Sequence, residues 1–199
     1  MSSPERIREN YARIKEEVGP RVTVVAATKY VSLDDMELLR EAGVPVVGEN
    51  RAQDLEAKHA RYGDAFRWHF IGHLQSRKAR DVSAVCELVH SLDSDSAAQR
   101  LTVPALVQVN LAGEESKSGV PPEELEAFVA RAPVEIRGLC TMPPLADDPE
   151  ESRPYFRRLR ELAESLGLAA LSMGTSQDYR VAAEEGATFV RVGSVLFAD

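Results

Sequence analysis

The chain has 199 residues, of which 44% are hydrophobic and 28% are charged, and its formal net charge is −8. A hydrophobic share of this size predicts a globular protein with a buried core and argues against intrinsic disorder. No apolar run approaches the roughly 18 residues of a membrane span, and the acidic excess argues against a protein that binds nucleic acid or anionic membranes.

Two further features bear on the compartment. The first residues contain no apolar stretch of the signal-peptide type, and the two cysteines are too few for a disulfide framework. We therefore expect a cytoplasmic protein. The negative charge is compatible with a small anionic ligand, because such a ligand needs only a few well-placed donors.

The first predicted element is an amphipathic helix close to the N-terminus. Its apolar side chains recur at i, i+4, i+7 and i+11, which places them on one helix face: Ile7, Tyr11, Ile14 and Val18. Pro4 suits the first turn of this helix, and Gly19 followed by Pro20 ends it.

Eight short apolar segments follow as predicted strands. They are Val22–Thr28, Pro45–Gly48, Trp68–Gly72, Leu88–Leu92, Ala105–Asn110, Ile136–Thr141, Ala170–Met173 and Thr188–Val192. Little polar alternation interrupts them, as is typical of parallel strands that are covered on both faces. Helical patterns separate the strands. Ser32 to Asp35 has the spacing of a capping box, and the apolar residues from Tyr155 to Leu166 share one helix face.

Alternating strands and helices indicate right-handed βαβ units, which build either an open doubly wound sheet or a closed (β/α)8 barrel. Eight strands favour the barrel, at about 25 residues per unit. We therefore predict a single α/β domain over residues 1–199, a TIM-type barrel with one helix before its first strand. The crossover Ser94–Val103 is short for a parallel connection, so we expect only one or two helical turns there.

A lysine follows the first predicted strand. Active sites of such barrels lie at the carboxyl ends of the strands, and this strand ends in Ala26-Ala-Thr-Lys29. We expect Lys29 at the barrel mouth with its amine directed inward and partly buried, where a neutral amine can attack a carbonyl group. A lysine whose head group extends into water is the alternative.

Three other strands also end in candidate ligand-binding residues. After the second strand, Asn50 and Gln53 have the spacing of a helix N-cap and its reciprocal partner, and a ligand contact of Asn50 would be additional. Small and hydroxyl-bearing residues follow the seventh and eighth strands, where barrels often bind phosphate. Gly193 permits close backbone approach, and Ser176 and Ser194 supply hydroxyl groups, although the same residue types occur in ordinary turns.

Arg191 interrupts the eighth predicted strand, and arginine is rarely buried without a partner. Period-two alternation places it on the same face as Phe189. If that face is the barrel interior, the guanidinium points at whatever occupies the barrel mouth. A salt bridge to a barrel carboxylate is the alternative.

The histidines do not indicate a metal site. His69 and His73 fall on a predicted strand and turn rather than on one helix face, and the two cysteines lack metal-ligand spacing. We therefore predict that no metal is bound. Asp147 and Asp148 lie in a proline-rich loop, where we expect them to be solvated.

The lysine after strand one, the arginine on strand eight and the hydroxyl groups after strands seven and eight together resemble a site for pyridoxal 5′-phosphate (PLP), a form of vitamin B6. The residues around them resemble the pyridoxal phosphate homeostasis protein family, single-domain relatives of the alanine racemase barrel. The matching segments run in family order over nearly the whole chain: Val25-Ala-Ala-Thr-Lys29, Gly48-Glu-Asn-Arg-Ala-Gln53, Trp68-His-Phe-Ile-Gly-His-Leu-Gln75, Val89-His-Ser-Leu-Asp-Ser94, Gln108-Val-Asn110, Gly138-Leu-Cys-Thr-Met142, Leu171-Ser-Met-Gly-Thr-Ser176 and Val190-Arg-Val-Gly-Ser194.

This resemblance implies a role for each candidate residue. Lys29 would form the internal aldimine, a Schiff base, with PLP. Arg191 would face the pyridine nitrogen and discourage its protonation, and Asn50 would lie near the ring. The phosphate would be held by Ser176, Gly193 and Ser194.

Three positions depart from the residues that are usual in the family, namely Cys140, Thr175 and Ala198. We expect none of them to touch the implied cofactor contacts.

By this resemblance, the chain binds PLP and buffers or delivers it in intracellular PLP homeostasis, without catalytic turnover. Its partners would be PLP-dependent apo-enzymes, and its expected state is a monomer. The alternatives are a PLP-dependent amino-acid racemase-like enzyme and a barrel enzyme in which Lys29 forms a Schiff base with a sugar phosphate. A racemase of this lineage needs a second domain whose dimer partner supplies the opposing base, whereas here the barrel takes up the chain.

Overall fold

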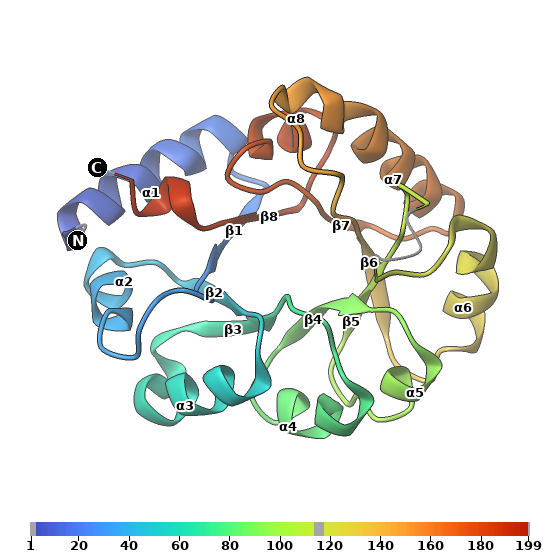
Figure 1. Ribbon diagram of the computed structural model, residues 1–199, viewed down its shortest axis with the longest axis horizontal. Coiled ribbons are helices and arrows are strands. Elements are labelled where there is room, and N and C mark those ends of the chain that lie inside the picture. Colours follow the sequence, from blue (N-terminus) through green and yellow to red (C-terminus); the bar gives the residue numbers. More distant parts are fainter. Residues whose placement is uncertain (1–2, 114–117, 199) are drawn as a thin grey trace.

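A computed structural model describes residues 3–113 and 118–198, and its eight parallel strands form a closed barrel (Figure 1). The strands pair in chain order, and β8 (Phe189–Val192) pairs with β1 (Thr23–Ala27) to close the barrel. Helices lie outside the barrel, and α1 (Pro4–Val18) precedes β1. The predicted α/β fold, a TIM-type barrel with an N-terminal helix, is confirmed.

Six further strands lie between the closing pair. They are β2 (Val46–Glu49), β3 (Arg67–Phe70), β4 (Leu88–Leu92), β5 (Ala105–Gln108), β6 (Ile136–Cys140) and β7 (Ala170–Ser172). Every predicted strand is present, with each end within two residues of its predicted position. Burial on both faces, which the apolar runs indicated, follows from the helices outside and the packed barrel interior.

The remaining helices form the outer layer. The α-helices are α2 (Met36–Ala42), α3 (Ala52–Tyr62), α4 (Ala79–Ser83), α5 (Asp95–Ala98), α6 (Leu125–Arg131), α7 (Arg153–Ser165) and α8 (Tyr179–Glu184). The 3-10 helices are η1 (Gly63–Ala65), η2 (Ser76–Lys78), η3 (Pro122–Glu124), η4 (Pro149–Ser152) and η5 (Ser194–Leu196). The short crossover before β5 holds the four-residue helix α5, as expected. Within the described ranges, no helix combines the length and apolarity of a membrane span.

Two predicted helix starts differ from the structure. Ser32 and Asp35 do form reciprocal hydrogen bonds, since the Ser32 hydroxyl donates to Asp35 (2.7 Å) and accepts from the Asp35 amide (3.1 Å), but these bonds close a turn and the helix begins at Met36. The prediction that Asn50 caps the next helix is wrong. Arg51 occupies that position without a side-chain cap, which leaves the Asn50 side chain available for other contacts.

Helix α1 holds the C-terminal segment in place. Ile7 and Ile14 are buried, as the helical spacing predicted. Asn10 on the same helix is also buried, and its side-chain amide donates to the carbonyl oxygens of Leu196 (3.2 Å) and Ala198 (2.9 Å). These bonds place η5 beside α1, next to the carboxyl end of β8 (Figure 1).

A row of hydrogen-bonded polar residues, which we call the interior polar row, leads from the exposed Glu87 side chain into the barrel interior through the buried residues His69, His90 and Ser172. His69 Nε2 lies 2.9 Å from a Glu87 oxygen, and His69 Nδ1 lies 2.9 Å from His90 Nε2. His90 Nδ1 lies 2.7 Å from the Ser172 hydroxyl. Phe189 packs edge-on against both imidazoles. Neither these histidines nor any other group in the described part of the chain forms a cluster able to hold a metal ion.

Candidate functional site

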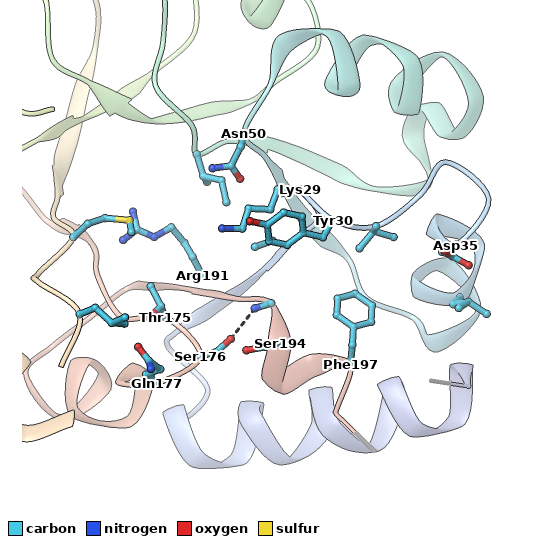
Figure 2. A pocket seen from close by; sticks show the side chains of 17 residues that line it. Lys29, Tyr30, Asp35, Asn50, Thr175, Ser176, Gln177, Arg191, Ser194 and Phe197 are labelled. Atoms are coloured by element: carbon cyan, nitrogen blue, oxygen red, sulfur yellow. Dashed lines mark hydrogen bonds between the residues drawn. The ribbon is translucent and has the colours of Figure 1, made fainter. Parts of the chain in front are cut away.

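A cavity of about 690 Å³ opens at the carboxyl ends of the strands (Figure 2). It is lined by Ala27, Lys29, Tyr30, Val31, Asp35, Leu38, Asn50, Ile71, Met142, Leu145, Thr175, Ser176, Gln177, Arg191, Gly193, Ser194 and Phe197. Its size lies within the range of small-molecule sites, and its position is the one at which TIM-type barrels place their active sites. All six candidate residues from the sequence line this one cavity.

Lys29 lies two residues beyond the end of β1 and reaches into the cavity, towards Asn50 and Arg191 (Figure 2). Its Nζ lies 4.8 Å from the centre of the Tyr30 ring. The expectation that Lys29 is partly buried is wrong, because the residue is exposed. Burial ends one residue earlier, at Thr28, where the chain leaves the barrel wall. The amine is therefore accessible both to a ligand in the cavity and to solvent.

Arg191 of β8 is only 6% exposed, and it extends from the barrel interior towards the cavity. Its Nη2 donates to the Thr141 carbonyl oxygen at 2.8 Å, and its Nη1 donates to the Cys140 sulfur at 2.6 Å. Its Nε is buried and has no hydrogen-bond partner in the described part of the chain. The expectation that Cys140 touches none of the site residues is therefore wrong, since its thiol is a direct partner of this guanidinium.

The alternative salt bridge of Arg191 does not form. Among residues 3–113 and 118–198, the hydrogen-bond partners of its guanidinium are the Cys140 sulfur and the Thr141 carbonyl oxygen, and no carboxylate lies within ion-pair distance. A buried cation without a counter-ion is costly, and an anionic or electron-rich ligand in the adjoining cavity would reduce that cost.

The loops after β7 and β8 meet at Ser176. The Ser176 hydroxyl accepts a hydrogen bond from the Gly193 backbone amide at 3.0 Å (Figure 2). It also accepts one from the Val195 amide at 3.4 Å, at the start of η5. A methyl group on Gly193 would meet no atom closer than 3.7 Å, so this glycine leaves space on the cavity side. Ser194 is exposed at the same edge. Hydroxyl groups and backbone amides thus gather where the sequence predicted a cradle for an anion.

Buried Asp178 fixes the shape of the loop after β7. It accepts hydrogen bonds from the Thr175 amide at 2.7 Å and hydroxyl at 3.1 Å, and from the Ser152 hydroxyl at 2.8 Å. Gly174 has a φ of +89°, and a methyl group there would lie 2.5 Å from the Ala182 side chain. Thr175, a departure from the family pattern, itself lines the cavity.

Asn50 presents another buried polar atom without a partner, because its Oδ1 accepts no hydrogen bond from any residue that the structure describes. The backbone is fixed at this point by Gly72, where a methyl group would lie 2.0 Å from the Asn50 carbonyl oxygen. An unpartnered acceptor on Asn50 and an unpartnered donor on Arg191 line the same cavity as the Lys29 amine. This donor and acceptor set fits a planar, anionic carbonyl compound such as PLP.

Sequence reasoning missed a buried ion pair that lies beside the site. Lys58 of α3 pairs with Glu49, the last residue of β2, and both are almost fully buried. A signal was present in the sequence, since Lys58 lies on the same helix face as the buried Leu55 and Tyr62. A charged residue on such a face requires a partner from another element.

Other proteins share both the sequence and the fold. Residues 3–199 match the family model described as alanine racemase, N-terminal domain. A pyridoxal phosphate homeostasis protein of Aquifex aeolicus is 40% identical over 196 residues, which cover 88% of this chain and 86% of the relative. The protein of the same name from Pseudomonas aeruginosa is 38% identical over 97% of this chain and 94% of its own length.

Solved structures agree with these matches. PipY of Synechococcus elongatus, with PLP bound, superposes with a TM-score of 0.86 at 33% identity, covering 96% of this chain and all of that one (100%). Alanine racemase from Bartonella henselae gives a TM-score of 0.80 at 15% identity and is covered over 60% of its length, which shows a shared fold alone. The chain therefore belongs to the alanine racemase N-terminal domain family and, within it, to the pyridoxal phosphate homeostasis proteins.

Proposed function

We propose that this protein binds PLP in the cavity, attaches it reversibly to Lys29, and buffers or delivers it within the cytoplasm without catalytic turnover. The observation that carries the proposal is the convergence on one cavity of a lysine amine, an anion cradle and a buried arginine that has no counter-ion among residues 3–113 and 118–198. The names of its relatives and the PLP bound to PipY support the choice of ligand.

Each residue has a distinct task in this proposal. PLP, when bound, supplies an aldehyde, an aromatic ring and a phosphate. Lys29 Nζ attacks the aldehyde carbon, a C=N bond forms and one water molecule leaves. Arg191 Nε donates towards the ring nitrogen and, as a permanent cation, keeps that nitrogen unprotonated, which weakens the ring as an electron sink.

The cradle of Ser176, Gly193 and Ser194 holds the phosphate. The hydroxyl groups of Ser176 and Ser194 can donate to an anion. The amides of Gly193 and Val195, which donate to Ser176 in the ligand-free structure, would turn to the phosphate or orient Ser176 towards it. Asn50 offers its free Oδ1 to a donor on the ring.

The lining of the cavity supports binding rather than turnover. Racemisation needs an acid on the face of the substrate opposite the base. Among the described lining residues, Tyr30 and Asp35 are the other proton-transfer candidates. Tyr30 is 89% exposed, and Asp35 is engaged by the Ser32 hydroxyl at 2.7 Å. Neither is held in place opposite Lys29.

An absorbance titration tests the proposal. Purified protein with added PLP is expected to develop the absorbance of an imine, borohydride is expected to fix the label on Lys29, and Lys29→Ala is expected to lose both signals. Racemisation of L-alanine by the purified chain would contradict the absence of turnover. If the protein takes up no PLP but borohydride fixes an aldose phosphate on Lys29, the ligand is a sugar phosphate and not PLP.

Delivery to PLP-dependent apo-enzymes is the second part of the proposal. The mouth of the cavity carries exposed apolar side chains, namely Tyr30, Met142 and Leu145, at 89%, 52% and 85% exposure. Direct transfer predicts that an apo-enzyme gains activity faster from the loaded protein than free PLP is released into buffer. Equal rates would indicate release followed by diffusion. We propose that the carrier is a monomer, which light scattering measures directly.

A further inference from the structure

A buried charged cluster lies beside the cavity, and we call it the Glu49 cluster: Glu49, Lys58 and Thr28. Glu49 and Thr28 have no exposed surface, and Lys58 is 5% exposed. Lys58 Nζ donates to Glu49 Oε1 and, at 2.8 Å, to the Thr28 carbonyl oxygen. The Thr28 hydroxyl donates to the same Glu49 oxygen at 2.6 Å.

The other oxygen of Glu49 reaches the site itself. Glu49 Oε2 accepts a hydrogen bond from the backbone amide of Asn50 at 3.1 Å. The carboxylate is therefore held by three donors from three segments: the end of β1, the start of the loop after β2, and helix α3. Such full hydrogen bonding is what permits a charge pair to remain buried.

A buried ion pair costs more free energy than apolar side chains packed into the same space. Burying two charges costs desolvation free energy that the pair barely recovers, and apolar residues of similar volume are often as stabilising. The benefit of an ion pair over apolar packing is direction, because each hydrogen bond fixes the position of a particular atom. The atoms fixed here belong to the peptide units next to Lys29 and Asn50.

Lys29 depends on this support more than the other site residues do. Its side chain is exposed, and within the described residues its Nζ has a contact to the Tyr30 ring but no hydrogen-bond partner. The direction of the amine is then set by its backbone, which begins at the Thr28 carbonyl held by Lys58. The Thr28 amide is also bound, to the Gly48 carbonyl at 3.0 Å.

We propose that the Glu49 cluster is a positioning device that sets Lys29 and Asn50 relative to each other, so that the amine and the amide meet the same PLP molecule. The inference rests on the proposed attachment of PLP to Lys29. None of the three residues lines the cavity, so their effect on PLP would pass through the backbone.

The test compares PLP retention among variants of the cluster. Lys58→Met removes the cation while keeping most of the side-chain volume, and Thr28→Val removes only the hydroxyl group. After dilution of the loaded protein, imine absorbance is expected to decay at least ~10-fold faster in Lys58→Met and ~3-fold faster in Thr28→Val. The pH midpoint of that absorbance is also expected to shift. Thr28→Ser, which keeps the hydroxyl, is expected to restore both properties.

Two control variants on α3 separate positioning from loss of stability. Arg61→Met removes an exposed ion pair with Asp34, which also lies in the loop after β1, and is expected to retain PLP like the wild type. Leu55→Ala weakens the buried face of the same helix without touching the cluster. Each variant is assayed at the same number of degrees below its own melting temperature. Under these conditions, Lys58→Met and Thr28→Val should release PLP faster than Leu55→Ala.

Hydrogen exchange of the ligand-free protein gives a readout that is independent of PLP. The amides of Thr28, Val31 and Asn50 are bonded within or next to the cluster, and we expect them to exchange at least ~10-fold faster in Lys58→Met. Wild-type exchange together with wild-type release and pH midpoint in both cluster variants would overturn the inference. If the wild-type protein with PLP shows no imine absorbance that depends on Lys29, the proposed function is refuted instead. The amide exchange rates would still decide whether the cluster orders the two loops.

Discussion

His90 makes the stability of this protein depend on pH in a way that can be calculated. It lies in the middle of the interior polar row and is completely buried. Burial, together with the charges of His69 and Arg191, holds the pKa of His90 well below its ordinary value. Burial also lowers the pKa of His69, against the neighbouring Glu87 carboxylate, which raises it. In the folded protein His90 therefore stays neutral in mildly acidic solution.

The unfolded chain behaves differently, because a solvated histidine has a pKa of about 6.5. Below that pH the unfolded state binds a proton that folded His90 does not, so the free energy of unfolding falls as the pH falls. Between pH 7 and pH 5 this difference amounts to about 2 kcal/mol for one histidine that remains neutral when folded. Burial raises the pKa of Glu87, but the hydrogen bonds and charges of Arg67 and His69 together lower it below its ordinary value, so this carboxyl group takes up its proton below pH 5.

Urea unfolding at pH 7, 6 and 5 measures the effect. We expect His90→Gln to be less stable than the wild type at pH 7, because the row loses a partner, but to lose about 2 kcal/mol less between pH 7 and pH 5. His59→Gln, on the outer helix α3, is the matched control and should keep the wild-type dependence. A His90→Gln protein whose dependence on pH equals that of the wild type would refute the assignment of a neutral, buried imidazole.

Two further predictions concern the anion cradle. Ser176→Ala removes a hydroxyl group that can donate to the phosphate and that also accepts from the Gly193 and Val195 amides. We expect PLP binding to weaken by about 10- to 100-fold, the equivalent of about 1.5–3 kcal/mol for hydrogen bonds to a charged group. Titration with pyridoxal, which lacks the phosphate, should show no such loss, and an equal loss for both compounds would place the phosphate elsewhere. Gly193→Ala is expected to change the free energy of unfolding by no more than about 0.5 kcal/mol, because its nearest neighbours would lie 3.7 Å away. The same variant should bind PLP at least ~10-fold more weakly, as the added methyl group fills the cradle, and wild-type affinity in a calorimetric titration would contradict this placement.

The sequence predicted the barrel well because its signals are local. Each strand is an apolar run bounded by turn residues, and the topology rules for parallel strands leave few arrangements of eight such runs. Arg191 was identifiable for the same reason, since a charge within an apolar strand requires an explanation. Its orientation followed from the alternation of side chains, and its position on the face of Phe189 is confirmed by the contacts of both residues inside the barrel.

The parts of the site that sequence reasoning missed depend on contacts between distant elements. Lys29 was expected to be partly buried, yet exposure depends on where the barrel wall ends, which is set by the neighbouring strands. The Glu49 and Lys58 pair joins a strand to a helix, and the contact of Cys140 with Arg191 joins two strands. No local pattern specifies such pairings, although a lysine on a buried helix face and an arginine in a strand each indicate that a partner exists.

The interior polar row also has a direction. Glu87 can only accept, so His69 donates to it from Nε2, His90 donates from its Nε2 to the freed Nδ1 of His69, and Ser172 donates to His90. A shift of β7 by one residue during barrel closure would turn Ser172 outward and leave His90 Nδ1 buried without its donor, next to Phe189. A barrel closed in the wrong register would therefore lose a buried hydrogen bond, a cost that a purely apolar interior would not impose. The interior polar row thus favours one register of the strands.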